Sequence, residues 1–404
     1  MQRYILYLIL SLALIHALSN VAYGMWIQKA SFGGDARHRC TGFSIGNKGY
    51  IGGGHTNSGT LAYFKDYWEY DPGTNSWTQI ADYGGGYRYH STAFTIGNYA
   101  YVGLGENDNS EYCNDFWKYI PLINTWVQVA AFPGEPRRGA CAFMIDDIGY
   151  CGTGQTETGY ALDFYAYNPM DNTWTQITDF SGEARSSAVA FAHDGKGYVG
   201  TGHVFGDDRA DFFEYDPTSN TWTQKADVGV TPRQDATGFV LHGEAYIGTG
   251  NNTEGTENFD DFWKYNFTSD SWIQIADFDG QARRYMVSFT IGDIAYCGTG
   301  TTGTNLRDFW AFIPLLSNSE LKHDNPLAVY PNPCTTHFFI SGIQSESYPL
   351  QLAMYDLNGR LVENKNLPNE NASVAVDNVK EGNYIIVVTT NQNQITVGYL
   401  SIIP

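Results

Sequence analysis

The chain has 404 residues, which is long enough for one large domain and one small one. Only 16% of the residues are charged, whereas Gly, Tyr, Trp and Phe are abundant, so the composition favours an all-β protein with many tight turns. The formal net charge of -20 argues against nucleic acid as a partner, because a polyanion gains nothing from a phosphate backbone.

The N-terminal segment has the pattern of a signal peptide. Arg3 supplies a positive charge, and residues 5–18 are almost all apolar but too few to span a bilayer comfortably. Small residues then fit cleavage before Asn20 or before Met25. We therefore expect a signal peptide over 1–24, with a membrane anchor as the alternative. No later segment has the pattern of a transmembrane span.

Three phrases recur six times along the chain, which indicates a repeat architecture. The first phrase opens at Trp26, Trp77, Trp126, Trp174, Trp222 and Trp272. The second reads Tyr-x-Gly-x-Gly and opens at Tyr50, Tyr101, Tyr150, Tyr198, Tyr246 and Tyr296. The third combines Asp with aromatic residues and opens at Asp66, Asp115, Asp163, Asp211, Asp261 and Asp308. Six copies of one structural unit follow from these phrases.

Each repeat is expected to form four short strands joined by turns. In the fifth repeat these strands are predicted at 236–241, 245–250, 261–265 and 272–276, with turn residues between them. Four-stranded units repeated around an axis make a β-propeller.

The two ends of the array predict how the ring closes. The sixth repeat, which ends near Phe312, lacks its Trp strand, because Ser319 stands where that Trp is expected. A spare Trp strand, 26–30, precedes the first repeat. Pairing it with 308–312 would complete the sixth unit and cover a sheet edge. The prediction is a six-bladed β-propeller over 25–314, closed by the N-terminal strand.

The array resembles kelch repeats. The kelch pattern separates a Tyr and a Trp by six residues, as here in Tyr70–Trp77, Tyr119–Trp126, Tyr167–Trp174, Tyr215–Trp222 and Tyr265–Trp272. The kelch glycine pair is kept only in the first repeat, as Gly53-Gly54. This resemblance implies the propeller fold. It does not select a function, because kelch propellers include enzymes, lectin-like modules and protein-binding modules.

A different pattern follows the repeats. We expect a linker at 315–326 and a small β-sandwich at 327–404, with a hairpin turn at Asn358-Gly359. The Tyr-Pro-Asn-Pro opening, the Tyr-Asp-Leu-Asn-Gly-Arg-Leu-Val hairpin and a Gly-x-Tyr strand resemble the type A sorting domain of the type IX secretion system. The chain ends on 400–404 without the basic tail that family members often carry.

The sorting resemblance implies a place and a partner. It implies that the type IX machinery exports the chain across the outer membrane of a Gram-negative bacterium, with release into the medium or anchoring at the surface. A carbohydrate-binding or adhesion sandwich is the alternative interpretation of this domain.

One face of the propeller is predicted to bind ligand. The loops between second and third strands vary from 7 to 11 residues and share a face with the links between blades. A repeating arginine lies towards this face, at Arg37, Arg88, Arg137, Arg185, Arg233 and Arg283. These arginines either form a cationic mouth for a carboxylate or sulfate, or pair with the repeating Asp. Six regular copies favour the pairing, and one or two blades could do both.

Other candidate ligand-binding residues lie in the same loops. His55 and His203 follow a Gly-x-Gly phrase, and Tyr112 and Tyr160 could stack on sugar rings. The acidic loop clusters 106–109 and 207–208 could hold calcium, but solvated loops are the favoured interpretation. No CxxC pair or zinc spacing joins the six cysteines, which are expected to be mostly buried thiols. No metal site and no cofactor is predicted.

These observations favour a non-catalytic propeller, secreted or at the cell surface, that binds a glycan or a protein. The alternative is a sugar-acting enzyme of sialate mutarotase or galactose-oxidase type, since both are kelch propellers. No acid–base pair stands out beyond the repeating Asp, and scattered histidines do not make a copper site. The enzyme would be favoured by a central cleft that holds an Arg without a partner beside a Glu or His that also lacks a partner.

Overall fold

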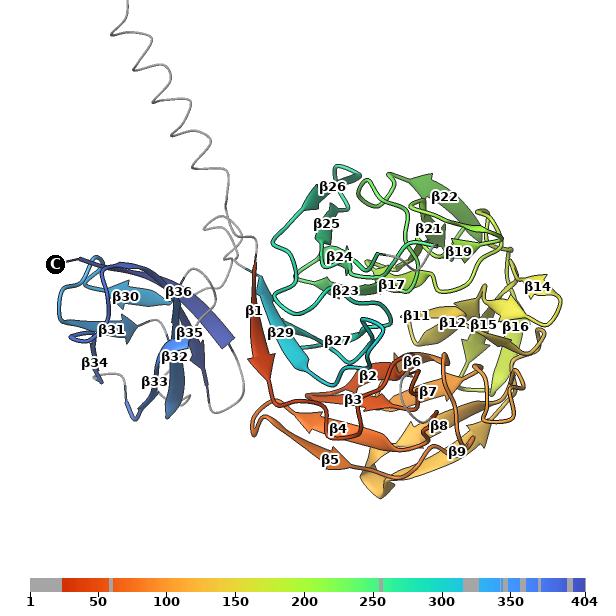
Figure 1. The fold of residues 1–404 in the computed structure, drawn as a ribbon, viewed down its shortest axis with the longest axis horizontal. Helices are drawn as coiled ribbons and strands as arrows, with labels where there is room; N and C mark the ends of the chain where they lie inside the picture. The colour runs from red at the N-terminus through yellow and green to blue at the C-terminus, as the bar shows by residue number, and fades with distance from the viewer. Residues whose placement is uncertain are drawn as a thin grey trace, which may run out of the picture.

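The structure is a computed structural model, and it describes residues 24–57, 61–253, 257–314, 327–341, 343, 348–356, 361–369, 372–390 and 395–403. Six four-stranded antiparallel sheets are arranged in a ring, and a β-sandwich lies beside it (Figure 1). The predicted signal peptide, apart from Gly24, and the predicted linker 315–326 lie outside the described residues.

Each blade runs from an inner strand at the axis to an outer strand at the rim. Blade one contains β2 (Thr41–Ile45), β3 (Lys48–Gly52), β4 (Tyr67–Asp71) and β5 (Ser76–Gln79). Blade two contains β6 (Thr92–Ile96), β7 (Tyr99–Gly103), β8 (Phe116–Ile120) and β9 (Thr125–Val129), with a 3₁₀ turn η1 (Pro121–Ile123). Blade three contains β11 (Cys141–Ile145), β12 (Ile148–Gly152), β15 (Phe164–Asn168) and β16 (Thr173–Gln176).

The other three blades repeat this order. Blade four contains β17 (Val189–His193), β18 (Lys196–Gly200), β21 (Phe212–Asp216) and β22 (Thr221–Lys225). Blade five contains β23 (Thr237–Leu241), β24 (Glu244–Gly248), β25 (Phe262–Asn266) and β26 (Ser271–Gln274). Blade six contains β27 (Val287–Ile291), β28 (Ile294–Gly298), β29 (Phe309–Pro314) and, as its outer strand, β1 (Gly24–Lys29).

The N-terminal strand completes the sixth blade, as the sequence predicted. β1 pairs antiparallel with β29, and Trp26 lies opposite Phe312. The Trp26 ring also packs on Phe262 of blade five, with ring centroids 4.9 Å apart. The inner strands β27 and β2 contact each other, so the sixth blade meets the first as neighbouring blades do elsewhere in the ring. β1 begins at Gly24, the last residue of the predicted signal peptide.

Regular alternation explains why these strands form blades. Along the inner strand β2, Thr41, Phe43 and Ile45 are buried, whereas Gly42 and Ser44 between them are half-buried. The Tyr of the third strand and the Trp of the fourth lie opposite each other, as in Tyr70 and Trp77, whose rings are 5.0 Å apart. These aromatic contacts fill the spaces between blades.

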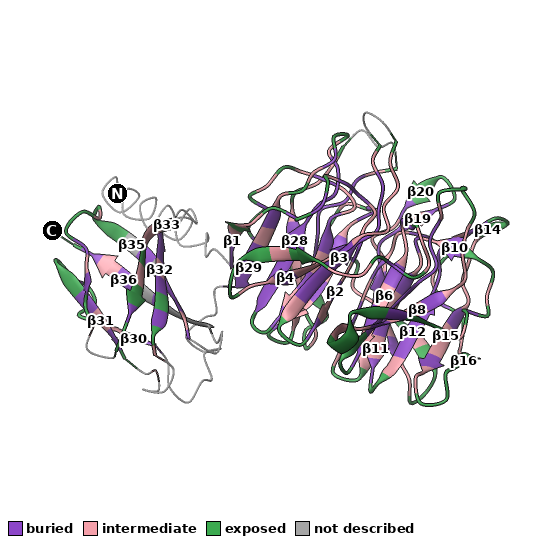
Figure 2. Cartoon of the chain, turned by 90° about the horizontal axis from the view of Figure 1, so that it is seen from below, coloured by how far each residue is buried: buried purple, intermediate pink, exposed green. Residues whose placement is uncertain are grey.

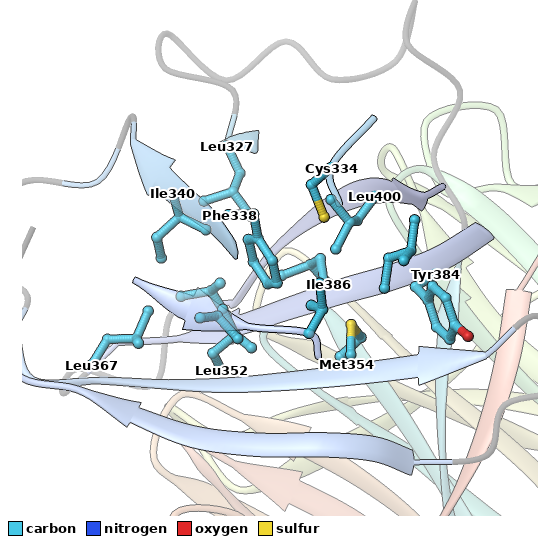
Figure 3. Packing of buried hydrophobic residues seen from close by; sticks show 14 of the residues in the cluster. Leu327, Cys334, Phe338, Ile340, Leu352, Met354, Leu367, Tyr384, Ile386 and Leu400 are labelled. Carbon is cyan, nitrogen blue, oxygen red and sulfur yellow. The ribbon is translucent and has the colours of Figure 1, made fainter. Parts of the chain in front are cut away.

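The C-terminal region forms two packed sheets. One contains β30 (Ala328–Tyr330), β31 (His337–Ser341) and β34 (Val374–Ala375). The other contains β33 (Leu361–Leu367), β32 (Leu350–Asp356), β35 (Gly382–Thr389) and β36 (Ile395–Ile402). Figure 3 shows Phe338, Leu352, Met354 and Ile386 in the core between them. β32 and β33 pair as predicted, although the turn at Asn358-Gly359 lies outside the described residues.

All six cysteines are free thiols. Cys141, Cys151, Cys297 and Cys334 are buried, and burial raises the pKa of each of these thiols. The expectation that the cysteines act mostly as buried hydrophobic groups is confirmed.

Candidate functional site

The six repeating arginines lie inside the blades, where they bind the repeating aspartates. The guanidinium groups pair with Asp66, Asp115, Asp163, Asp211, Asp261 and Asp308. Arg233 is typical, with Nη1 and Nη2 at 2.6 and 2.7 Å from the two carboxylate oxygens of Asp261. Each arginine is at most 4% exposed. The structure thus forms the predicted pairing in every blade, and none of the six arginines lines the central cavity.

Each arginine also binds backbone at the end of the second strand. Nη1 of Arg233 donates to the carbonyl oxygen of Thr249, a residue in the left-handed conformation. Burial alone would raise the pKa of Asp261, but hydrogen bonds and charge from Arg233 bring that pKa below its ordinary value. The pair therefore joins the second and third strands of its blade, which is a structural role.

Two residues after each arginine, the chain enters a narrow ring around the propeller axis. We name this set the neck ring, and its members are Arg39, His90, Gly139, Ser187, Asp235 and Tyr285. All six have positive φ between 55° and 61°. Five are not glycine, so the backbone holds ordinary side chains in a conformation that L-residues rarely adopt. Such strain at a repeated position accompanies functional sites.

Backbone hydrogen bonds join these residues from blade to blade. The amide of His90 donates to the carbonyl of Arg39 at 2.9 Å, and that of Gly139 donates to His90 at 3.0 Å. The same step continues through Ser187, Asp235 and Tyr285, at 2.9 to 3.4 Å. The conformation that makes these bonds also aims each side chain at the axis. The neck ring is therefore a rigid frame that presents five different side chains and one glycine.

The side chains of the neck ring form an asymmetric polar cluster. Nη2 of Arg39 donates to the Tyr285 hydroxyl at 2.6 Å, and its guanidinium lies 4.5 Å from the centre of the Tyr285 ring. The Ser187 hydroxyl lies 3.3 Å from Nε2 of His90. Burial raises the pKa of Asp235, although the Arg39 charge and the hydroxyl groups of Ser187 and Tyr285 act against this shift.

A second layer lies above the neck ring and forms the mouth of the propeller. Six short backbone pairings make it: His38–His55, Tyr89–Glu106, Arg138–Gln155, Ser186–His203, Gln234–Asn251 and Arg284–Thr301. Some extend into the short strands β10 (Arg137–Arg138), β13 (Gln155–Thr156), β14 (Gly159–Tyr160), β19 (His203–Val204) and β20 (Asp207–Asp208). Figure 2 shows β10, β14, β19 and β20 at one end of the propeller.

Four residues predicted as ligand-binding belong to this mouth. The ring centroid of His55 lies 4.3 Å from that of His38, with the two rings tilted, and Nη1 of Arg39 lies 3.4 Å from Nε2 of His55. Nδ1 of His203 lies 3.0 Å from Oδ1 of Asp208. The Tyr112 ring lies 5.3 Å from the guanidinium of Arg138, and the Tyr160 ring lies 5.7 Å from that of His203. These residues surround the mouth, and His55 is the one in contact with the neck ring.

Three histidines near Arg39 are held neutral. Burial, with the Arg39 charge adding to it, lowers the pKa of His38 to about 3 and that of His55 to about 4. The same causes lower the pKa of His90 well below its usual range. A guanidinium can only donate, so Nε2 of His55 accepts from Arg39 and its proton sits on Nδ1.

Acidification from pH 6.5 to pH 4 is expected to destabilise the native protein. The unfolded chain binds protons on histidines that the native state keeps neutral, so stability is full above pH 6.5 and falls below it. We expect His38 to account for about 2 kcal/mol of this loss. The pKa values of Asp66, Asp261 and Asp308 are lowered from 3.8, so these carboxylates contribute mainly below this window.

Urea denaturation at pH 7, 5.5 and 4 measures this effect. A His38→Asn variant should lose part of the pH dependence, whereas His242→Asn, at a partly exposed position away from the neck, should keep it. Asp235, whose pKa is raised, acts in the opposite direction near pH 4. Equal pH dependence in His38→Asn and the wild type would contradict the assignment.

A cavity of about 220 Å³ follows the axis, lined by the neck ring and the first residues of the inner strands. Within the described part of the chain, four buried polar atoms of this cluster have no hydrogen-bond partner: Arg39 Nε, His55 Nδ1, His90 Nδ1 and Asp235 Oδ1. Buried polar groups are normally satisfied. Unmet donors and acceptors beside a cavity are typical of a site for a polar ligand.

The acidic loop clusters are engaged by basic side chains. Glu106 pairs with Arg138 at 2.5 Å, and Asp207 pairs with Arg209 at 2.7 Å. In the described residues, no group of three His, Cys, Asp or Glu side chains could hold a metal ion. This part of the chain therefore offers no support for calcium or copper at these positions.

Sequence reasoning did not find the neck ring. The repeating arginine was visible because it repeats, whereas the residue two positions later differs in every blade. That difference was the available signal, because a position that changes within an otherwise regular repeat is not needed for packing the blade.

Comparison with known proteins found similarity for both the C-terminal region and the propeller. Residues 328–400 match the family model described as "Secretion system C-terminal sorting domain". The solved structure titled "Structure of YjhT" is similar with a TM-score of 0.61 at 17% identity, covering 72% of this chain and 98% of that chain. At this identity the likeness shows the propeller fold alone. No curated protein matches the chain.

These findings place the protein outside the cell. The C-terminal region is a type IX secretion sorting domain, so the chain is exported to the surface of a Gram-negative bacterium or secreted. Among the described residues, no helix is long and apolar enough to cross a membrane.

Proposed function

We propose that the protein is an exported kelch-type propeller that binds an acidic sugar in its central mouth. The observation that carries this proposal is Arg39, a cation in the neck ring whose side-chain hydrogen bonds go to the Tyr285 hydroxyl and a neutral histidine, while Asp235 interacts with it through charge. The blade arginines, by contrast, each hold a carboxylate. Arg39 is therefore the group best suited to bind a carboxylate or sulfate of a ligand.

The shape and chemistry of the mouth support a glycan rather than a protein partner. The cavity of about 220 Å³ is narrow and concave, which suits a single sugar residue better than a protein surface. Asp235, which lines the cavity, and Glu106, which lies in the mouth layer above the neck ring, can accept hydrogen bonds from sugar hydroxyls. Tyr89 and Tyr112 provide aromatic faces above the neck ring. Export brings this mouth into contact with extracellular polysaccharide.

A second candidate function is catalysis on an acidic sugar of the sialate mutarotase type. Asp235 favours it, because this buried carboxyl has a raised pKa and lies close to Tyr285 and Arg39. A carboxyl with a raised pKa is better suited to exchange a proton with a substrate than an ordinary carboxylate, and Tyr285 or His90 could assist. For the galactose-oxidase alternative, the described residues hold no group of three His, Cys, Asp or Glu side chains that could bind a metal ion.

Isothermal titration calorimetry of the full chain tests the proposal. Glucuronic acid and N-acetylneuraminic acid should bind, whereas glucose and glucosamine should bind at least about tenfold more weakly. Equal affinity for glucose and glucuronic acid would overturn the anionic preference, and binding of none of them would overturn the glycan proposal. NMR measurement of the rate at which the anomers of the acidic sugar interconvert separates the two functions. If catalytic amounts of protein accelerate this interconversion, the protein is an enzyme and not a binding module.

A further inference from the structure

The outer edge of blade six differs from every other blade. At this edge β1 and β29 pair Met25 with Ile313. The equivalent pairs in blades one to five are Ser76–Asp71, Thr125–Ile120, Thr173–Asn168, Thr221–Asp216 and Ser271–Asn266. Five polar outer-strand residues thus correspond to one methionine. Where a repeat departs from its own pattern, packing or function at that place is the usual cause.

The apolar edge is buried by the C-terminal sandwich. Met25 and Ile313 are 6% and 4% exposed, and they cluster with Tyr355 of β32 and Val387 of β35. Ser76, Thr125, Thr173, Thr221 and Ser271, which correspond to Met25, are all exposed. Figure 1 shows the sandwich beside β1 and β29. The replacement of a polar outer-strand residue by methionine therefore occurs at the blade edge that the sandwich covers.

The sandwich presents a matching second face. Along β32, Leu352 and Met354 point into the sandwich core, so Ala353 and Tyr355 point to the other side of the sheet. In β35 the core residues Ile386 and Val388 alternate with Val387 in the same way. The four-stranded sheet is thus apolar on both faces, which an isolated two-sheet sandwich does not require.

We propose that the outer edge of blade six is a docking surface for the sorting domain of the same chain, and that docking clamps β1 in the sixth blade. The surface combines β1 with β29, which come from opposite ends of the propeller. It is complete only when the N-terminal strand has closed the ring. The sorting domain therefore docks on a closed propeller and not on an open one.

The propeller and the sandwich do not pack together over their whole interface. Beside the apolar cluster lies a groove of about 920 Å³ between the two domains, lined by Asn47, Asn75, Lys29, Gln351, Asn364 and Thr389. Burial of Lys29 lowers its pKa. Domains whose interface is interrupted by such a groove can move relative to each other. Release of the sorting domain would expose the apolar edge and free β1 to exchange.

Amide hydrogen exchange of the full-length chain tests the proposal. Each substitution is made in one domain, and the exchange is measured in the other domain. In Tyr355→Ser the propeller sequence is intact, and we expect the amides of β1 to exchange about tenfold faster. In Met25→Ser/Ile313→Asp, which recreates the pair of blade one, we expect the same change in β32 and β35. The matched control is Ile120→Asp, the same substitution in blade two, which should alter neither region.

Two results would overturn the clamp. The first is an unchanged rate of amide exchange in β1 of Tyr355→Ser. This result would count even if the substitution unfolded the sandwich, because the sorting domain would then be undocked while β1 stayed protected. Protection of β1 that rises with protein concentration would also do so, because a second copy rather than the sorting domain would then cover the edge. If Met25→Ser/Ile313→Asp fails to fold, the Tyr355→Ser comparison remains decisive.

Discussion

Replacing Arg185 by leucine is expected to lower the free energy of unfolding by about 3 kcal/mol. Arg185 is fully buried, and it binds both carboxylate oxygens of Asp211 together with the carbonyl oxygen of Thr201. Its loss leaves a partly buried carboxylate without its partner, and that cost exceeds what a surface ion pair contributes. Urea denaturation of the full chain, following the transition of the propeller, measures the change.

A surface ion pair of the same protein supplies the control. Arg209 pairs with Glu183 and Asp207 at the rim, where solvent screens the charges. Arg209→Leu is expected to change stability by less than about 1 kcal/mol. The double variant Arg185→Leu/Asp211→Leu should be more stable than Arg185→Leu alone, because no carboxylate is left unpaired. Equal losses for Arg185→Leu and Arg209→Leu would show that the blade pairs do not hold the strands together.

Replacing Arg39 by glutamine is expected to weaken binding of an acidic sugar about 100-fold. The charge-assisted hydrogen bonds to the ligand would be lost, which corresponds to about 3 kcal/mol. Glutamine keeps a polar group at this position but is two atoms shorter, so the hydrogen bond to the Tyr285 hydroxyl is lost together with the charge. Calorimetric titration with glucuronic acid measures the affinity, and urea denaturation verifies that the fold is kept.

Arg209→Gln is the matched control for this experiment. It removes one positive charge on the same face, but Arg209 lies outside the cavity and already holds two carboxylates. Its affinity for the sugar should stay within about twofold of the wild type. If both variants bind equally well, the ligand does not use the neck ring and the assignment of Arg39 fails.

The architecture could be predicted because the residues that form each blade recur at regular spacing along the sequence. Trp26 and Ser319 located the missing strand of the sixth repeat, and β1 pairs with β29 as that reasoning required. The pairing of Arg233 with Asp261 was predictable for the same reason, since six copies of each residue lie at fixed spacing. Regular periodicity reports packing, because each blade must fill the same space.

The site was less predictable, since it depends on what does not repeat. His55 was placed correctly near the mouth from its position after the Gly-x-Gly phrase, but Arg39, His90 and Asp235 were missed. They come from different blades and meet only because positive φ turns each of them towards one axis. Neither the left-handed conformation nor convergence on an axis is visible in the local sequence of residues such as Arg39.

The edge of blade six shows the same limit from another side. Met25 and Ile313 look ordinary in a β-rich sequence, and their meaning appears only when they are aligned with Ser76 and Asp71 of blade one. Comparing the blades with one another therefore identifies both the neck ring and the docking surface. The neck-ring residue differs in every blade, whereas the residue at the docking surface differs from the other blades only in blade six.

A crystal structure of the full chain with bound glucuronic acid tests the central claim most directly. The account predicts the sugar in the axial cavity, with its carboxylate on the guanidinium group of Arg39 and its hydroxyls near Asp235. A sugar bound at the rim or in the groove beside the sorting domain, with the neck ring unchanged, would contradict it.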